Sequence, residues 1–266
     1  MFSYHNHSVF SDGSAALEQM IISGVNHSLT EVGMSDHFSP LPDGRFPEWS
    51  MDKEALDAYF TQLTELRELY ADKIIVRRGV EIDYFDDNFQ DVLALLGKYS
   101  PDYIIGSVHY FGDFPIDECA DKWVALSREE ADAVTEGYWR KVVALAGAEG
   151  VGIMGHLDLC KKFGRFGKTD VSGLIDEALC AIRDTGKAME INTAGYYKPA
   201  REFYPAPDII RKAAEMEIPL LVNADAHYTA HIRRSFPDAL RLLSELGVTR
   251  LAGFEEGRLI LRDVDY

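Results

Sequence analysis

The chain has 266 residues and a formal net charge of −17, from 27 Lys and Arg against 44 Asp and Glu. This acidic balance argues against a general nucleic-acid binder, which needs a basic surface, and against docking on anionic membranes. A hydrophobic content of 47% provides for a large core, the length suits one α/β barrel, and no apolar run is long enough to span a membrane.

The cysteines and the first residues bear on localisation. Cys119, Cys160 and Cys180 are odd in number and form no Cys-x-x-Cys pair. This usage favours a reduced, cytoplasmic protein over a disulfide scaffold. The first residues have neither the basic nor the apolar region of a signal peptide, so we expect a cytoplasmic location. Neither feature bears on the oligomeric state.

Short β-branched or apolar runs alternate along the chain with longer amphipathic runs. Strands are predicted at Tyr4–Ser8, Glu31–Ser35, Lys73–Asp83, Tyr103–His109, Gly152–Leu157, Ala188–Asn192 and Pro219–Asp225. Helices are predicted at Ala15–His27, Met51–Ala71, Asn88–Tyr99, Ser127–Ala148, Ser172–Thr185, Pro207–Met216 and Asp238–Leu246. The tail, Arg250–Val264, is expected to add one or two short strands. Repeated strand–helix units predict an α/β fold whose parallel sheet closes into a barrel, in a single domain over 1–266.

Histidines and carboxylates recur at the C-terminal ends of these predicted strands. The candidate metal ligands are His5, His7, Asp12, His37, Glu81, His109, His156, Asp225 and His227. A single histidine at such a position is more often a hydrogen-bonded residue than a ligand. The parallel strands of a barrel deliver their C-terminal ends to one face, however, so all of these side chains are expected at one mouth. Because buried carboxylates must be paired or bind metal, the joint pattern predicts a metal cluster.

The number and type of these ligands indicate which ions they hold. One ion with three or four protein ligands would leave most of them unused, whereas three ions that share a bridging carboxylate would use them all. Imidazole and carboxylate ligands without cysteine suit Zn, Mn or Fe better than Mg. Closely spaced divalent ions lower the pKa of a bridging water and clamp the oxygens of a phosphoryl transfer. We therefore predict three divalent ions and a small phosphorylated substrate.

Cationic and aromatic side chains are expected beside such a site. Arg201, Arg165 and Lys161 follow the sixth and fifth predicted strands and are the main candidates for phosphate binding, with a solvated surface charge as the alternative for each. Arg233 and Arg234 are weaker candidates. Three aromatic residues could pack on a substrate ring or simply pack within their own loop: Phe111, Phe114 and Trp123.

Seven ordered motifs carry a resemblance to a known family. They are His5-x-His7 with Asp12, Ser35-Asp36-His37, Gly79-Val80-Glu81, Gly106-Ser107-Val108-His109, Gly155-His156, Glu190-Ile191-Asn192-Thr193 and Asp225-Ala226-His227. In this order they resemble the polymerase and histidinol phosphatase (PHP) superfamily, over essentially the whole chain. The resemblance implies a distorted (β/α)7 barrel with a trinuclear metal site.

The resemblance also implies a ligand set for each ion and an activity. The first ion would be held by His5, His7, Glu81 and Asp225, the second by Glu81, His109 and His156, and the third by Asp12, His37 and His227. The implied enzyme is a phosphomonoesterase most similar to stand-alone phosphatases of L-histidinol phosphate in histidine biosynthesis. A metal-bridging hydroxide, held by Glu81, Asp225 and His109, would attack phosphorus.

Three alternatives stay open from the sequence. A related phosphoesterase for nucleotides or phosphotyrosine would share the site and differ in the pocket. A barrel of the amidohydrolase type would not need Asp12, His37 and His227 as a third metal site. A non-enzymatic metal module is disfavoured by the complete set of ligands.

Overall fold

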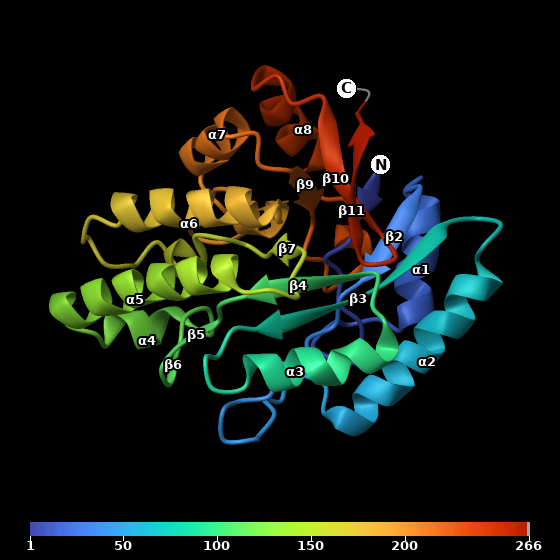
Figure 1. The fold of residues 1–266 in the computed structure, drawn as a ribbon, viewed down its shortest axis with the longest axis horizontal. Helices are drawn as coiled ribbons and strands as arrows, with labels where there is room; N and C mark the ends of the chain where they lie inside the picture. The colour runs from blue at the N-terminus through green and yellow to red at the C-terminus, as the bar shows by residue number, and fades with distance from the viewer. Residues whose placement is uncertain (265–266) are drawn as a thin grey trace.

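The computed structural model describes residues 1–264 and contains a seven-stranded parallel sheet with the strand order β1–β2–β3–β4–β7–β8–β9 (Figure 1). These strands are β1 (Phe2–Ser3), β2 (Glu31–Met34), β3 (Ile75–Asp83), β4 (Tyr103–Ser107), β7 (Ile153–Met154), β8 (Ala188–Asn192) and β9 (Leu220–Asn223). Each pair of neighbours is parallel. Parallel neighbours need a crossover connection, and most of these connections contain a helix.

The first and last strands of the sheet approach each other just beyond their regular ends. Asn6 and Ala226 form a parallel bridge. The Ala226 N–H donates to the His5 carbonyl at 3.2 Å, and the His7 N–H donates to the Ala226 carbonyl at 2.9 Å. These contacts nearly close the sheet, which confirms the predicted (β/α)7 barrel.

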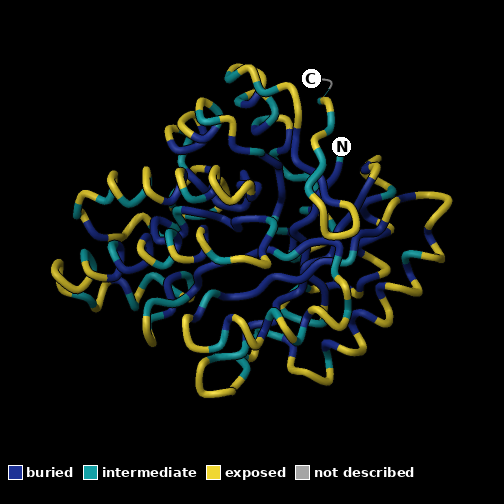
Figure 2. Tube along the Cα trace, in the orientation of Figure 1, coloured by how far each residue is buried: buried dark blue, intermediate teal, exposed yellow. Residues whose placement is uncertain are grey.

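Helices surround the buried strands, as Figure 2 shows by the exposed outer turns of the trace. They are α1 (Leu17–Asn26), α2 (Lys53–Leu69), α3 (Phe89–Leu96), α4 (Ala120–Val124), α5 (Arg128–Gly147), α6 (Ser172–Thr185), α7 (Pro207–Glu215) and α8 (Phe236–Glu245). In α2 one face is buried, formed by Leu56, Tyr59, Phe60, Leu63 and Leu66, in the period that the sequence predicts. No helix among residues 1–264 is long and apolar enough to cross a membrane.

Several strands are shorter at their C-terminal ends than predicted. β1 pairs regularly only over Phe2–Ser3, not over Tyr4–Ser8, and β9 ends at Asn223. The chain leaves the extended conformation at Asp225, whose φ is +50°. The polar residues expected at strand ends therefore lie mostly on the segments that follow the strands, at the mouth of the barrel.

The tail forms the hairpin β10 (Arg250–Glu255) and β11 (Arg258–Asp263), which confirms the predicted extra strands. The hairpin covers the end of the barrel opposite the mouth. Its Phe254 ring lies 6.5 Å from that of Tyr4, and Arg262 contacts the buried carboxylate of Glu31. Arg77 Nε also donates to Glu31, at 2.8 Å. Strands β1 and β11 consequently lie close together here, with the Arg262 guanidinium 5.7 Å from the Phe2 ring (Figure 1).

Candidate metal centre

The predicted ligands lie together at the C-terminal mouth of the barrel. Three groups of side chains could each hold an ion, because their ligand atoms lie within 4.8 Å of one another. The groups are His7, Asp12, His37 and His227; His5, Glu81 and His156; and His5, His7 and Asp225. His109 joins them through its Nε2, which is 3.2 Å from His156 Nε2. All nine candidates are therefore gathered into one cluster by segments far apart in the sequence.

Glu81, near the end of β3, lies at the centre of this cluster and is fully buried. Its Oε2 lies 2.8 Å from His5 Nε2 and 3.2 Å from His37 Nδ1, and its Oε1 lies 2.9 Å from His156 Nε2. Burial alone would raise the pKa of Glu81, but His5 and the other imidazoles hold it well below the usual value. The charged carboxylate thus lies between several imidazoles, where a bridging ligand would be needed.

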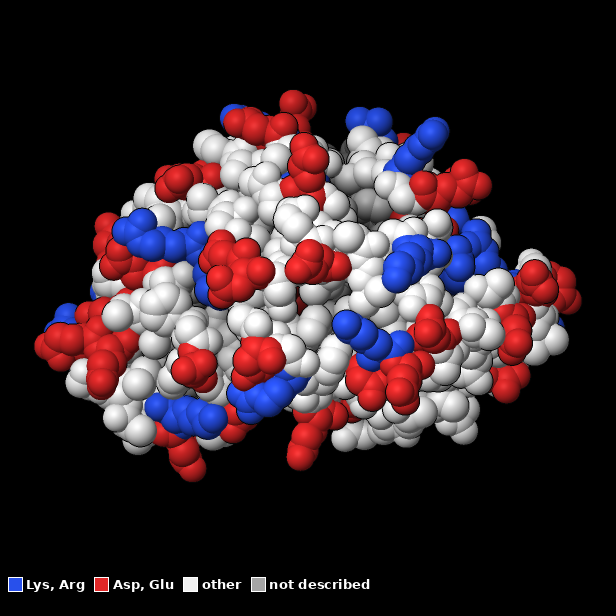
Figure 3. Space-filling view, turned by 60° about the horizontal axis from the view of Figure 1, so that its bottom comes forward, with Lys and Arg blue, Asp and Glu red and all other residues white. Residues whose placement is uncertain are grey.

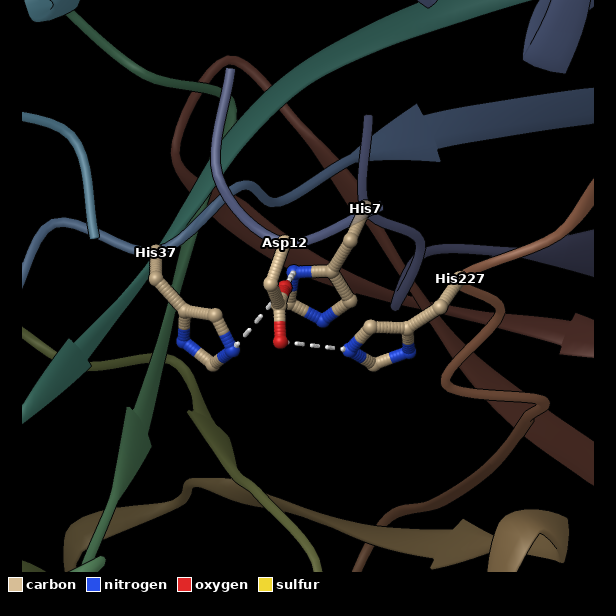
Figure 4. Close-up of side chains that lie close together, drawn as sticks. All are labelled: His7, Asp12, His37 and His227. Atoms are coloured by element: carbon tan, nitrogen blue, oxygen red, sulfur yellow. Dashed lines mark hydrogen bonds and ion pairs between the residues drawn. The ribbon is translucent and has the colours of Figure 1, made fainter. Parts of the chain in front are cut away.

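The outer group surrounds Asp12, and Figure 4 shows the rings of His37 and His227 directed toward its carboxylate. His227 Nε2 lies 3.2 Å from Asp12 Oδ2, and His37 Nε2 lies 3.8 Å from Asp12 Oδ1. His7 Nδ1 is 3.9 Å from the same carboxylate. About a third of the Asp12 side chain is exposed, whereas that of His7 is fully buried. This group therefore forms the side of the cluster that is open to solvent.

Unpaired buried nitrogens show that the cluster fits divalent ions. Both ring nitrogens of His7 are buried without a hydrogen-bond partner within the described chain. Burial and the neighbouring His37 and His227 lower the pKa of His7 to about 4, so its ring is neutral and has a free lone pair. Ligand atoms bound to one ion at about 2.1 Å are separated by about 3.0–3.4 Å. The His37–Glu81 and His109–His156 separations of 3.2 Å fall in this range, whereas His37 and His7 lie 3.8 and 3.9 Å from Asp12. The nitrogen and oxygen donors suit Zn, Mn or Fe.

Buried carboxylates outside the ligand set hold parts of the cluster in place. Asp36 is fully buried and accepts the N–H groups of Ser8 at 2.7 Å and Ser11 at 3.1 Å, on the segment that leads to Asp12. Burial raises the pKa of Asp36 to about 6. Asp83 Oδ1 lies 3.0 Å from His109 Nδ1, which leaves His109 Nε2 for a ligand bond. The sequence shows both acids at strand ends but does not separate such supports from ligands.

A cavity of about 420 Å³ opens on the cluster and has a cationic wall. Its cations are Lys162, Lys198 and Arg234, with His231 beside them. An adjoining cavity of about 300 Å³ shares the ligands Asp12, His37 and His109 with the first. Asp117 and Lys162 also line both cavities, and the lining of the second cavity is completed by Trp49, Tyr110, Pro115 and Glu118. Lys198 and Arg234 line the first cavity alone, whereas the aromatic rings of Trp49 and Tyr110 and the carboxylate of Glu118 line the second alone.

The residues predicted from sequence to bind phosphate lie outside the lining of both cavities. Lys161 is buried and pairs with Asp158 at 2.9 Å and Glu202 at 2.8 Å, while Arg165 and Arg201 are exposed. For Lys161 these two ion pairs account for its direction, whereas for Arg165 and Arg201 phosphate binding stays a prediction.

Of the cations that line the first cavity, Arg234 is only a weak candidate from the sequence, and Lys198 is not among the candidates. Position within a loop that follows a strand is the signal that could have indicated Lys198. The aromatic side chains that line the second cavity also differ from the three that were considered from the sequence. Trp123 is buried and donates its indole N–H to the Ile116 carbonyl at 2.8 Å, whereas Trp49 and Tyr110 face the second cavity.

A parallel β/α barrel with His, Asp and Glu side chains clustered at its C-terminal mouth defines the class of barrels whose mouth could hold metal ions. Within this class, the model of the PHP domain family matches residues 3–194, and the chain belongs to that family. It is 36% identical over 223 residues to the "Probable histidinol-phosphatase" of Deinococcus radiodurans, covering 82% of this chain and 83% of that protein.

Two further proteins are similar to this chain. It is 28% identical over 212 residues to the "Histidinol-phosphatase" of Bacillus subtilis, covering 73% of this chain and 77% of that protein. A crystal structure of histidinol phosphate phosphatase from Lactococcus lactis, complexed with Zn, L-histidinol and phosphate, superposes with a TM-score of 0.81 at 23% identity. The match covers 97% of this chain and 98% of that one, so the two share a fold.

Proposed function

We propose that this chain is a metal-dependent phosphomonoesterase that hydrolyses L-histidinol phosphate to L-histidinol and phosphate. The observation that carries the proposal is the cluster of candidate ligands, eight in the three groups together with His109, which opens directly into a cavity with a cationic wall. The similarity to proteins named histidinol-phosphatase supports the choice of substrate. Three divalent ions, Zn, Mn or Fe, would be held by His5, His7, Asp12, His37, Glu81, His109, His156, Asp225 and His227.

When bound, such ions supply an activated water at neutral pH and neutralise charge on the phosphoryl oxygens. The protein's own side chains would bind and orient the substrate. Lys162, Lys198 and Arg234 would bind and orient the phosphate, with Arg234 able to reach two oxygens at once. Arg234 Nη1 donates to His231 Nδ1 at 3.2 Å, so the ring proton of neutral His231 is on Nε2. His231 would then donate a hydrogen bond to a phosphoryl or ester oxygen.

The second cavity suits the other end of the substrate. L-Histidinol phosphate has an ammonium group and an imidazole, which aromatic and acidic side chains can bind. Trp49 and Tyr110 offer aromatic rings, and Asp117 and Glu118 offer carboxylates. Lys162 Nζ donates to Asp117 Oδ2 at 2.9 Å, which joins this wall to the cationic one. AMP, in contrast, carries no ammonium group that could pair with Glu118.

The proposal is tested by measuring phosphate release from a panel of esters after the protein has been loaded with Zn, Mn or Fe. The panel contains L-histidinol phosphate, AMP and phosphotyrosine, and kcat/KM should be highest for the first. A higher value for AMP or phosphotyrosine would reassign the substrate. Asp225→Ala and His109→Ala should each abolish release without a change in the circular dichroism spectrum; full turnover by either variant would refute the metal centre.

A further inference from the structure

Glu190, in the middle of β8, is a fully buried carboxylate beside the cluster that none of the three ligand groups uses. Four N–H groups reach its two oxygens. Its Oε2 accepts from His5 Nδ1 and from Asn223 Nδ2, both at 2.7 Å. Its Oε1 accepts from the backbone N–H of His156 at 3.0 Å and from Asn192 Nδ2 at 2.7 Å. Glu190 therefore links β8 to β9 and to the segments that follow β1 and β7, which carry the predicted ligands His5 and His156.

The contact between Glu190 and His5 Nδ1 sets which ring nitrogen of His5 is available to a metal ion. With its Nδ1 proton donated to Glu190, His5 keeps Nε2 free of a proton when a metal ion is bound. That nitrogen lies 2.8 Å from Glu81 Oε2 and 3.6 Å from Asp225 Oδ1. The His5 ring therefore directs the lone pair of Nε2 toward the carboxylates of Glu81 and Asp225.

The two asparagines have fixed orientations, so they cannot turn acceptors toward Glu190. Asn223 Oδ1 accepts the Tyr4 N–H at 2.8 Å, and Asn192 Oδ1 accepts the Ala194 N–H at 2.9 Å. Each amide nitrogen must then face the carboxylate. Asn192 Nδ2 also lies 3.2 Å from Asp225 Oδ2, which links the same network to a second predicted ligand.

We propose that Glu190 is a positioning residue that sets the metal affinity of the cluster, by fixing the tautomer of His5 and the backbone at His156. The proposal rests on the metal-dependent function proposed above. Carboxylates that hold the second nitrogen of a metal-binding histidine typically change affinity ten- to a hundredfold when replaced. Glu190 differs from a simple partner of this kind, because it also orders His156 and, through Asn192, Asp225.

The change Glu190→Gln isolates this role, because it keeps size and shape. All four neighbours of the side chain are donors, so the new NH₂ group must face two of them. If the NH₂ group faces His5 and Asn223, His5 Nδ1 loses the acceptor that fixes its tautomer. If it faces Asn192 and the His156 N–H, the backbone at His156 loses its acceptor. Turning an asparagine to compensate would cost its hydrogen bond to Tyr4 or Ala194.

The experiment measures the affinity of the metal-free protein for Zn²⁺ by competition with a chromophoric chelator, for the wild type and for Glu190→Gln, Glu190→Asp and Glu31→Gln. Glu31 is an equally buried carboxylate at the opposite end of the barrel, held by Arg77, Arg262 and Tyr4. We expect Glu190→Gln to weaken binding ten- to a hundredfold, Glu190→Asp to recover part of the loss, and Glu31→Gln to lower the melting temperature with unchanged affinity.

If Glu190→Gln bound Zn²⁺ with the affinity of the wild type, the proposal would be overturned. An equal loss of affinity in Glu31→Gln would also overturn it, because the loss would then follow from lower stability in general. If Glu190→Gln does not fold, ¹⁵N NMR of the histidines in the Zn-loaded wild type provides the test, since His5 must have its proton on Nδ1. Failure of the wild type to bind Zn²⁺ at all would instead refute the proposed function.

Discussion

Two consecutive lysines, Lys161 and Lys162, differ in whether their side chains reach the cavity. Lys161 and Lys162 follow β7 in a single short turn. Lys161 turns into the protein and pairs with Asp158 and Glu202, whereas Lys162 reaches the cavity and donates to Asp117. The same contrast separates Lys198, in the cavity lining, from the exposed Arg201 in the same loop.

Lys198→Met should weaken the binding of a phosphorylated substrate. The change removes one charged donor from the cationic wall, and a hydrogen bond to a charged group contributes about 1.5–3 kcal/mol, equivalent to about a ten- to hundredfold rise in KM. Steady-state kinetics of phosphate release checks this expectation. Arg201→Met is the matched control, because Arg201 is exposed and outside the lining; a rise in KM for Arg201→Met with none for Lys198→Met would reverse the assignment.

At the scale of elements, α5 positions one wall of the second cavity. The hairpin of β5 (Tyr110–Phe111) and β6 (Phe114–Pro115) packs on α5, with the Phe111 ring above Gly137. A Cβ atom at Gly137 would meet this ring at 2.0 Å, so only glycine allows the close approach. The helix thereby sets the position of Tyr110, which lines the cavity.

Gly137→Ala should both destabilise the protein and impair substrate binding. Displacing the Phe111 ring resembles overpacking of a core, which costs about 1–3 kcal/mol, and it would shift Tyr110 with the hairpin. Chemical denaturation and KM measure the two effects. Gly147→Ala, at the end of the same helix, meets nothing within 4 Å and should be neutral or stabilising by up to about 1 kcal/mol. Equal behaviour of the two variants would contradict the packing argument.

For the whole molecule, the net charge of −17 describes the surface more than the site. Figure 3 shows Asp and Glu side chains spread over one face, with Lys and Arg among them. Inside the mouth, carboxylates face imidazoles, and the bound ions of the proposed function would add positive charge. A small phosphate ester can therefore be attracted to the cavity of a protein whose exterior is acidic.

The stability of the metal-free protein should depend on pH through this cluster. Burial lowers the pKa of His109 and His227, but Asp83 beside the first and Asp12 beside the second outweigh it and raise these values to about 10 and about 9. Because both lie above the ordinary value of 6.5, their stabilisation is complete below pH 6.5 and is lost as the pH rises through 9 to 10.

The melting temperature of chelator-treated protein, measured between about pH 6 and pH 10, should therefore fall with rising pH. The metal-loaded protein should lose less over the same range, because bound ions need deprotonated imidazoles. A flat profile for the metal-free protein would show that the imidazoles of the cluster are not protonated there.

Metal content distinguishes the proposed site from the alternatives. Elemental analysis of the loaded protein should find up to three equivalents of divalent ion, since the described ligands form three groups. Chelation should abolish phosphate release, and added Zn, Mn or Fe should restore it. A maximum of two equivalents would favour an arrangement of the amidohydrolase type, and full activity without metal would refute the centre.

The order of the strands and helices could be predicted from local patterns, and so could the polar residues that meet at the mouth. Strands alternating with helices define a parallel barrel, and such a barrel brings the ends of its strands to one face whatever the details of packing. His5 and Glu81 could therefore be placed together from positions 76 residues apart. One or two short strands in the tail, Arg250–Val264, were also expected, and the structure has two that pair as a hairpin.

Local patterns could not show which loop side chains face the cavity, or which carboxylates support the predicted ligands. Side-chain direction in a loop depends on contacts with distant segments, as when Glu202 draws Lys161 away from the cavity. Whether a buried acid binds a metal or holds a histidine depends on which atoms lie within hydrogen-bond distance, and Glu190 and Glu81 are alike in sequence terms. These choices are made by packing across the barrel, which local patterns in a sequence do not encode.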